Sequence, residues 1–64
     1  MEWLIRDLRV AANNYRLGKI DERTWGWERG YFSGFLNARA HEISDDNLRA
    51  WRAESDFLYQ YAAR

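Results

Sequence analysis

Residues 17–25, with the sequence LGKIDERTW, decide the fold of this 64-residue chain because they end one helix and begin another. Gly18 fits the left-handed position that commonly follows a helix C-terminus. Asp21 is a good N-cap, since its carboxylate can accept hydrogen bonds from free amides of the next turn. Ile20 before this cap and Trp25 after it fit a hydrophobic staple. The stretch therefore predicts a tight turn between two helices.

A second junction of the same kind lies in residues 42–48, with the sequence EISDDNL. Ser44 is the expected N-cap there, and Ile43 and Leu48 form the staple. The two aspartates that follow Ser44 suit the positive end of a helix dipole. This stretch therefore predicts the start of a third helix.

Hydrophobic periodicity predicts three amphipathic helices joined by these two turns. They span about residues 2–17, 22–41 and 45–62. No proline interrupts them, and the alternation typical of strands is absent. We predict an all-α fold with a single domain over residues 1–64. Whether the second and third helices form a sharp corner, an antiparallel hairpin or part of a three-helix bundle stays open.

The composition excludes several classes of function. The chain has no cysteine, one histidine and ten basic against ten acidic residues, so its formal net charge is zero. His41 has no second histidine or cysteine with which to build a metal site. Asp45 and Asp46 are adjacent, so on a helix they point about 100° apart and cannot act as a paired acid and base. We therefore expect no enzyme, no catalytic residue, no cofactor and no metal.

Protein binding is favoured by the kinds of residue that the chain uses. Seventeen per cent of the residues are aromatic, and all but one of the basic residues are arginine. Tryptophan, tyrosine and arginine dominate binding hot spots, although this usage can also reflect the base composition of a genome. A domain this small, without disulfides or metal, commonly gains stability by oligomerisation. No apolar run is long enough to cross a membrane or to serve as a leader, so we expect a complete cytoplasmic protein without a membrane partner.

A second apolar stripe on the first helix carries the main prediction of an interface. Trp3, Val10 and Leu17 recur at seven-residue spacing, opposite the stripe that would face the core. Trp27 and Tyr31 on the second helix are likewise in excess of one core face. We predict that these five residues contact another chain, most simply in a homodimer. The alternative is that the third helix covers the stripe within one compact bundle.

The second helix carries glycine at every fourth position: Gly26, Gly30 and Gly34. Each interior glycine costs about 1 kcal/mol relative to alanine, and close approach of another helix can offset that cost. We therefore predict close helix packing at these three residues, with the second helix at the centre of the fold because it is apolar over most of its circumference. The alternative is that they mark a bend or a loop.

Residues 38–52 resemble a helix-turn-helix, with small and apolar residues at the positions that such a motif needs. The resemblance implies a dimeric DNA-binding regulator that reads DNA with residues 45–62, through Arg49 and Arg52. Glu42 stands where the turn usually has glycine, and the two aspartates at the start of the third helix would repel phosphates. With zero net charge, nucleic acid is not the expected partner.

In its size, in its lack of cysteine and in the style of its first hairpin, residues 15–25, the chain resembles the small helical accessory and early-region proteins of temperate phages. Such proteins often bind host proteins or regulators, so the resemblance implies a regulatory role and a host or viral partner. No functional residue is transferred by it. The sequence therefore predicts a non-enzymatic protein–protein interaction module.

Overall fold

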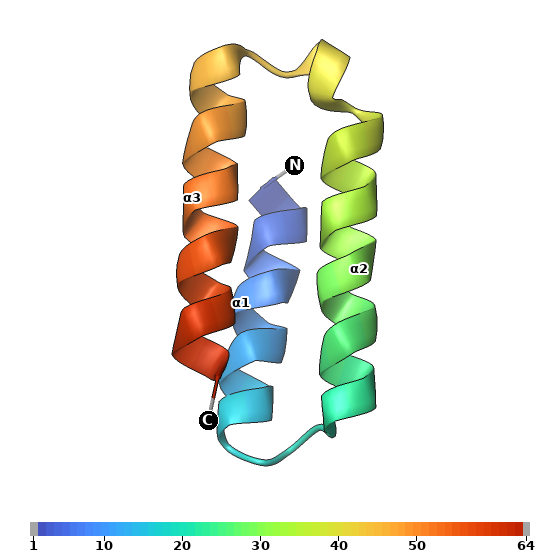
Figure 1. Ribbon diagram of the computed structural model, residues 1–64, viewed down its shortest axis with the longest axis vertical. Coiled ribbons are helices and arrows are strands. Elements are labelled where there is room, and N and C mark those ends of the chain that lie inside the picture. The colour runs from blue at the N-terminus through green and yellow to red at the C-terminus, as the bar shows by residue number, and fades with distance from the viewer. Residues whose placement is uncertain (1, 64) are drawn as a thin grey trace.

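The computed structural model describes residues 2–63, and it is built of helices (Figure 1). The elements, in chain order, are α1 (Glu2–Arg16), α2 (Glu22–Ala38), the short 3-10 helix η1 (Ala40–Glu42) and α3 (Asp45–Ala62). No strand occurs within the described range. The predicted all-α fold of three helices is confirmed, and residues 1 and 64 of the predicted domain lie outside the described residues.

The three helices form an elongated bundle in which α1 is the central element. Figure 1 shows α2 and α3 running antiparallel side by side, with α1 lying behind the space between them. Helix α1 packs against both of the others, whereas α2 and α3 approach each other much less closely. The expectation that the second helix is central is therefore wrong. The second and third helices form an antiparallel hairpin and not a sharp corner.

The turn after α1 follows the predicted capping chemistry. Gly18 has a φ of 77°, a conformation that glycine adopts without the steric cost of a Cβ. The backbone N–H of Lys19 donates to the carbonyl oxygen of Asn14 at 2.8 Å, and that of Gly18 donates to Tyr15 at 3.0 Å. This pair of bonds is a Schellman motif, which satisfies carbonyls left free at the helix end.

Both predicted N-caps are present. A carboxylate oxygen of Asp21 accepts from the backbone N–H of Thr24 at 2.7 Å, and the Ser44 hydroxyl accepts from Asn47 at 3.3 Å. The end of the second helix differs from the prediction, because α2 stops at Ala38 rather than near residue 41. No glycine follows to reverse the chain there, and the backbone tightens into η1 before it extends at Ile43.

The core is formed by one apolar side of each helix. Its buried residues are Leu4, Ile5, Leu8, Ala11 and Ala12 of α1, Trp25, Phe32 and Leu36 of α2, and Leu58 and Ala62 of α3. Ser55 is buried among them, and its hydroxyl donates to the carbonyl oxygen of Arg52 at 2.9 Å. Most of the buried side chains are therefore large, which compensates in part for the short length of the chain.

Candidate functional site

The stripe on α1 faces solvent along its whole length. Trp3, Val10 and Leu17 are between 48% and 59% exposed. Helix α3 packs on another side of α1, where Arg9 forms a salt bridge with Glu54. The interpretation in which the third helix covers the stripe is therefore wrong for this chain.

On the side of α1 that contacts α3, polar groups of the two helices form hydrogen bonds with each other. The hydroxyl of Tyr61 donates to the side-chain oxygen of Asn13 at 3.1 Å, and the Arg16 guanidinium donates to the Tyr61 carbonyl oxygen at 3.1 Å. The same guanidinium lies over the Tyr61 ring, 4.5 Å from its centre. These contacts lie on the side of α1 that faces α3, so the second apolar stripe lies on a different side of the helix.

A connected aromatic surface joins α1 to α2. The Trp27 and Tyr31 rings stack with centres 5.5 Å apart, and Tyr31 lies 6.2 Å from Phe35. Phe35 in turn meets Trp3 edge to face at 5.7 Å. We call these four side chains, Trp3, Trp27, Tyr31 and Phe35, the aromatic surface. Three of the five predicted interface residues therefore lie in one patch that spans two helices.

Phe35 is the member that the sequence analysis missed. It is half-buried against the core, and the Arg39 guanidinium lies 4.9 Å from its ring centre. Its position four residues after Tyr31 and eight after Trp27 was the available signal, because residues at that spacing share one side of a helix. Phe35 links the two exposed rings of α2 to Trp3, so it makes the surface continuous.

Val10 and Leu17 lie beside this surface in different ways. Val10 lines a shallow hollow between α1 and α2, together with Thr24 and Glu28 of α2. Thr24 also borders Trp27, so Val10 is close to the end of the aromatic surface. Leu17 follows the last turn of α1 and is exposed at the end of the stripe.

The glycines of α2 do not pack against another helix of the chain. A Cβ built on Gly30 or Gly34 would meet nothing within 4 Å, and one on Gly26 would meet only the guanidinium of Arg29 at 3.7 Å. The predicted close packing is therefore wrong within the chain. Helix α2 packs its Trp25 and Phe32 side against the core, and these glycines lie on other sides of the helix. The alternative of a loop is also wrong, since α2 is helical through all three.

A second exposed aromatic group lies on the α1–α3 side. Phe57 is 64% exposed and stacks on Tyr61 with ring centres 6.3 Å apart. The sequence analysis placed no interface there. Tyr61 is already engaged by Arg16 and Asn13, so this pair is smaller and more polar than the aromatic surface.

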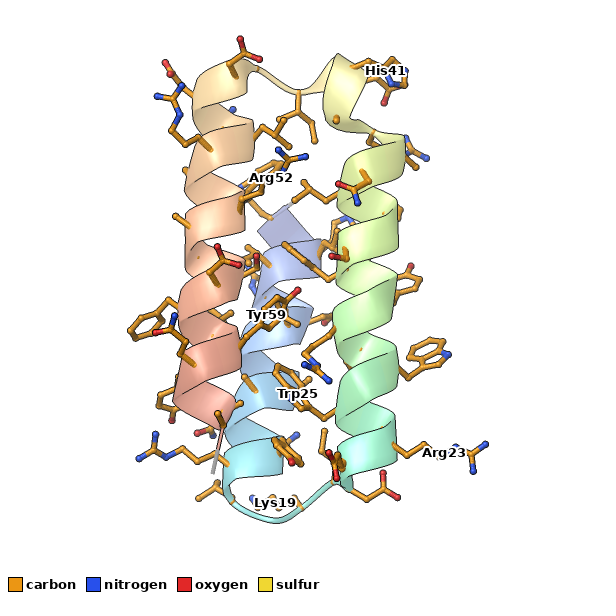
Figure 2. The ribbon with its side chains drawn as sticks, in the orientation of Figure 1. Lys19, Arg23, Trp25, His41, Arg52 and Tyr59 are labelled. Carbon is orange, nitrogen blue, oxygen red and sulfur yellow. The ribbon has the colours of Figure 1, made fainter. Side chains whose placement is uncertain are left out.

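The residues of the DNA-binding alternative do not form a basic patch. Figure 2 shows Arg52 directed into the space between α2 and α3, where it donates to the side-chain oxygen of Asn37 at 3.3 Å. Arg49 shares a shallow hollow with Asp45 and Asp56, so charges of both signs lie side by side. Moreover, a helix-turn-helix crosses its helices at about 90–120°, whereas α2 and α3 run antiparallel (Figure 1).

Among the described residues, the titratable groups with shifted pKa values are Asp21, which caps α2, and Arg9, which pairs with Glu54 between α1 and α3. Hydrogen bonds from the Thr24 side chain and backbone hold the pKa of Asp21 below its usual range. A hydrogen bond to Glu54 raises the pKa of the Arg9 guanidinium further. His41 is exposed at the end of the bundle, 3.6 Å from a Glu42 carboxylate oxygen. Among residues 2–63, no three acidic or histidine side chains lie together as metal ligands would.

Two further findings concern the chain as a whole. Over the described residues, no helix combines the length and the apolar character that crossing a bilayer requires. Comparison with protein-family models, with curated proteins and with solved structures gives no match to this chain.

Proposed function

We propose that this chain is a non-enzymatic protein–protein interaction module, a cytoplasmic accessory or regulatory protein of the phage type. The observation that carries the proposal is the aromatic surface. Tryptophan and tyrosine supply large contact area with few rotatable bonds, which is why they are enriched among the residues that dominate binding energy. The partner is a second copy of the chain, or a host or viral protein.

The continuity of the aromatic surface distinguishes it from ordinary exposed apolar residues. Single exposed apolar side chains are normal on a protein surface, whereas connected patches tend to mark interaction sites. Trp27, Tyr31, Phe35 and Trp3 form an unbroken series of ring contacts of 5.5–6.2 Å. Val10 extends the apolar area along α1. Such a surface gains free energy when another protein removes it from water.

The charges around the aromatic surface suit a polar rim. Arg39 lies over the Phe35 ring and also 3.6 Å from a Glu42 carboxylate oxygen, at one end of the surface. Arg23 borders Trp27 at the other end. Interfaces commonly combine an apolar centre with charged residues at the margin, and both guanidiniums are exposed here.

Photo-crosslinking in the native host tests this proposal. We expect a chain with the photoreactive residue p-benzoylphenylalanine at position 31 to form covalent adducts with protein. The same residue at position 57 is the matched control, because both natural side chains are exposed aromatics on different sides of the bundle. Adducts specific to position 31 support the proposal, whether they contain a second copy or another protein. Equal adducts at the two positions, or none, would contradict it.

A further inference from the structure

One side of α2 points away from the bundle and carries an unusual set of residues. At 3.6 residues per turn, Trp27, Gly30, Tyr31, Gly34 and Ala38 lie opposite the side that α2 turns to the core. All five are exposed, and none is charged. We call these five residues the outer face of α2. A surface helix normally places charged and polar residues on its solvent side.

Of the charged residues of α2, only Arg23 lies on this side of the helix. Arg29 reaches back over the bundle, and its guanidinium lies 5.8 Å from the Trp25 ring centre and 5.9 Å from that of Tyr59. Glu28 lines the hollow beside Val10. Arg23 alone approaches the outer face, at the first turn of the helix, and Figure 2 shows its side chain pointing away from the bundle. The helix therefore has two apolar sides, of which only one is covered.

The two glycines on the outer face have no compensation within the chain. An interior glycine favours a helix less than alanine does, and a domain of this size is only marginally stable. Nothing in the fold requires a glycine at either position, because an added Cβ would meet no atom within 4 Å. A neighbour that needs this space would return the cost.

We propose that the outer face of α2 binds the same face of a second copy, with the two α2 helices antiparallel about a two-fold axis near Gly30 and Tyr31. This inference rests on the proposed function and names its partner. In a two-fold interface, a residue that contacts another is contacted by it in return. Antiparallel pairing about that axis places Trp27 of each copy over Gly34 of the other, and it brings the two Gly30 residues together on one side of the axis and the two Tyr31 rings together on the other. Each Trp27 ring then meets a residue without a side chain.

Charge favours the antiparallel arrangement. A parallel pair would bring the two Arg23 guanidiniums to the same level. The antiparallel pair separates them by roughly 22 Å along the axis, at 1.5 Å per residue, which exceeds the screening length of about 8 Å at physiological salt. It also brings each Arg23 to the C-terminal end of the other α2, where the C-cap residue Arg39 is paired with Glu42 at 3.6 Å. The Glu42 carboxylate and the negative end of the helix dipole offset the repulsion between the two guanidiniums there.

The available area also suits a dimer of this chain. A specific interface buries about 800 Å² on each partner, which is roughly a sixth of the 4559 Å² exposed by this chain. Helix α2 alone is about 25 Å long and provides part of that area. The ring contacts through Phe35 to Trp3 extend the apolar surface onto α1. Pairing centred on α2 therefore draws on the whole side of the bundle that α3 leaves free.

Sedimentation equilibrium of three chains tests the proposal. We expect the wild type to pass from monomer to dimer as its concentration rises. Gly34→Leu fills the space that Trp27 of the second copy needs, so it should weaken association at least tenfold without unfolding the monomer. Ser33→Leu is the matched control, because it adds the same side chain to an exposed position about 100° around the helix. It should leave association unchanged, and circular dichroism verifies the fold of each variant.

The register is tested by disulfide cross-linking, which is clean because the chain has no cysteine. We expect Gly30→Cys to form a disulfide-linked dimer under mild oxidation, since the two-fold axis passes beside this residue. Ser33→Cys, off the face, should remain monomeric. A dimer with equal cross-linking at both positions overturns the antiparallel α2 pairing.

The outcomes separate this inference from the proposed function. A wild type that stays monomeric at every concentration, or a dimer that Gly34→Leu leaves intact, overturns the second copy as the occupant. If position 31 still forms adducts with a different protein in the host, the interaction module stands and only this inference fails. If position 31 forms no specific adducts either, both fail.

Discussion

Trp25 and Trp27 are two residues apart in one helix, yet they have opposite surroundings. Trp25 is 3% exposed, stacks near Tyr15 and meets Tyr59 edge to face. Trp27 is 66% exposed, and among the described residues its ring stacks on Tyr31, which is 44% exposed. The same side chain therefore stabilises the fold at one position and only stacks on a neighbouring ring at the other. The fold explains the first tryptophan, and the proposed pairing would bury the second.

This contrast shows how a short chain can hold a packed core and an exposed aromatic surface at once. The inner side of α2 supplies three large residues to the core, and the capping turns hold α2 against α1. The outer side is free of packing constraints, so glycines are tolerated there. Each of them costs about 1 kcal/mol relative to alanine, and nothing within the chain offsets that cost.

Removal of the inner tryptophan should have the largest effect. We expect Trp25→Ala to lower the free energy of unfolding by about 3–5 kcal/mol, because it deletes a fully packed aromatic ring. That loss is comparable to the total stability of a domain of this size. Urea or thermal unfolding followed by circular dichroism measures it. A loss below about 1 kcal/mol would show that Trp25 is not part of a packed core.

Two glycines should respond with opposite sign. Gly18→Ala places a side chain at a φ of 77° and should destabilise the fold by about 1–2 kcal/mol. Gly30→Ala adds a methyl group to open space and should stabilise the monomer by about 1 kcal/mol. Thermal melts at low protein concentration compare the two. If Gly30→Ala destabilised the monomer, the outer face of α2 would not be open.

Acid should weaken the cap that begins α2. The pKa of Asp21 is lowered in the folded chain by hydrogen bonds from Thr24, so the ionised group stabilises the fold above its unfolded value of about 3.9. That contribution is lost as the pH falls through the lower folded value. We expect the melting temperature of Asp21→Asn to fall less steeply below pH 4 than that of the wild type. Ser44→Ala, at the other cap, is the control and should retain the acid dependence.

The outer tryptophan should matter least to the isolated chain. At concentrations where the chain is monomeric, we expect Trp27→Ala to change the free energy of unfolding by no more than about 0.5 kcal/mol, as is usual for exposed residues. The same melt as for Trp25→Ala measures it. A large loss would place Trp27 in the core and remove the contrast between the two positions.

Much of the fold could be predicted from the sequence, because local chemistry determines it. Gly18, Asp21 and Ser44 each act as expected, and the helix periodicity places α1 and α3 within a residue or so of their observed ends. The end of α2 could not be predicted as well, since no glycine or proline marks it. The tightening at Ala40 arises from the geometry of the hairpin rather than from a local signal.

The rotation of the helices was harder to predict than their positions. The excess of apolar surface on α1 was evident, but which stripe α3 would cover depended on pairs such as Arg9 with Glu54, which are distant in the sequence. The glycines of α2 were misassigned for the same reason. Spacing shows that Gly30 and Gly34 share a side of the helix, whereas only the packed fold shows that this side is uncovered.

The indole N–H signals of Trp25 and Trp27 in NMR spectra test the central claim most directly. A soluble paramagnetic agent attenuates signals that are open to solvent, and single Trp→Phe variants assign them. We predict that Trp25 is protected at every protein concentration, while Trp27 is attenuated in dilute solution and becomes protected as the chain is concentrated. A Trp27 signal that is equally attenuated at all concentrations would contradict pairing through the outer face of α2.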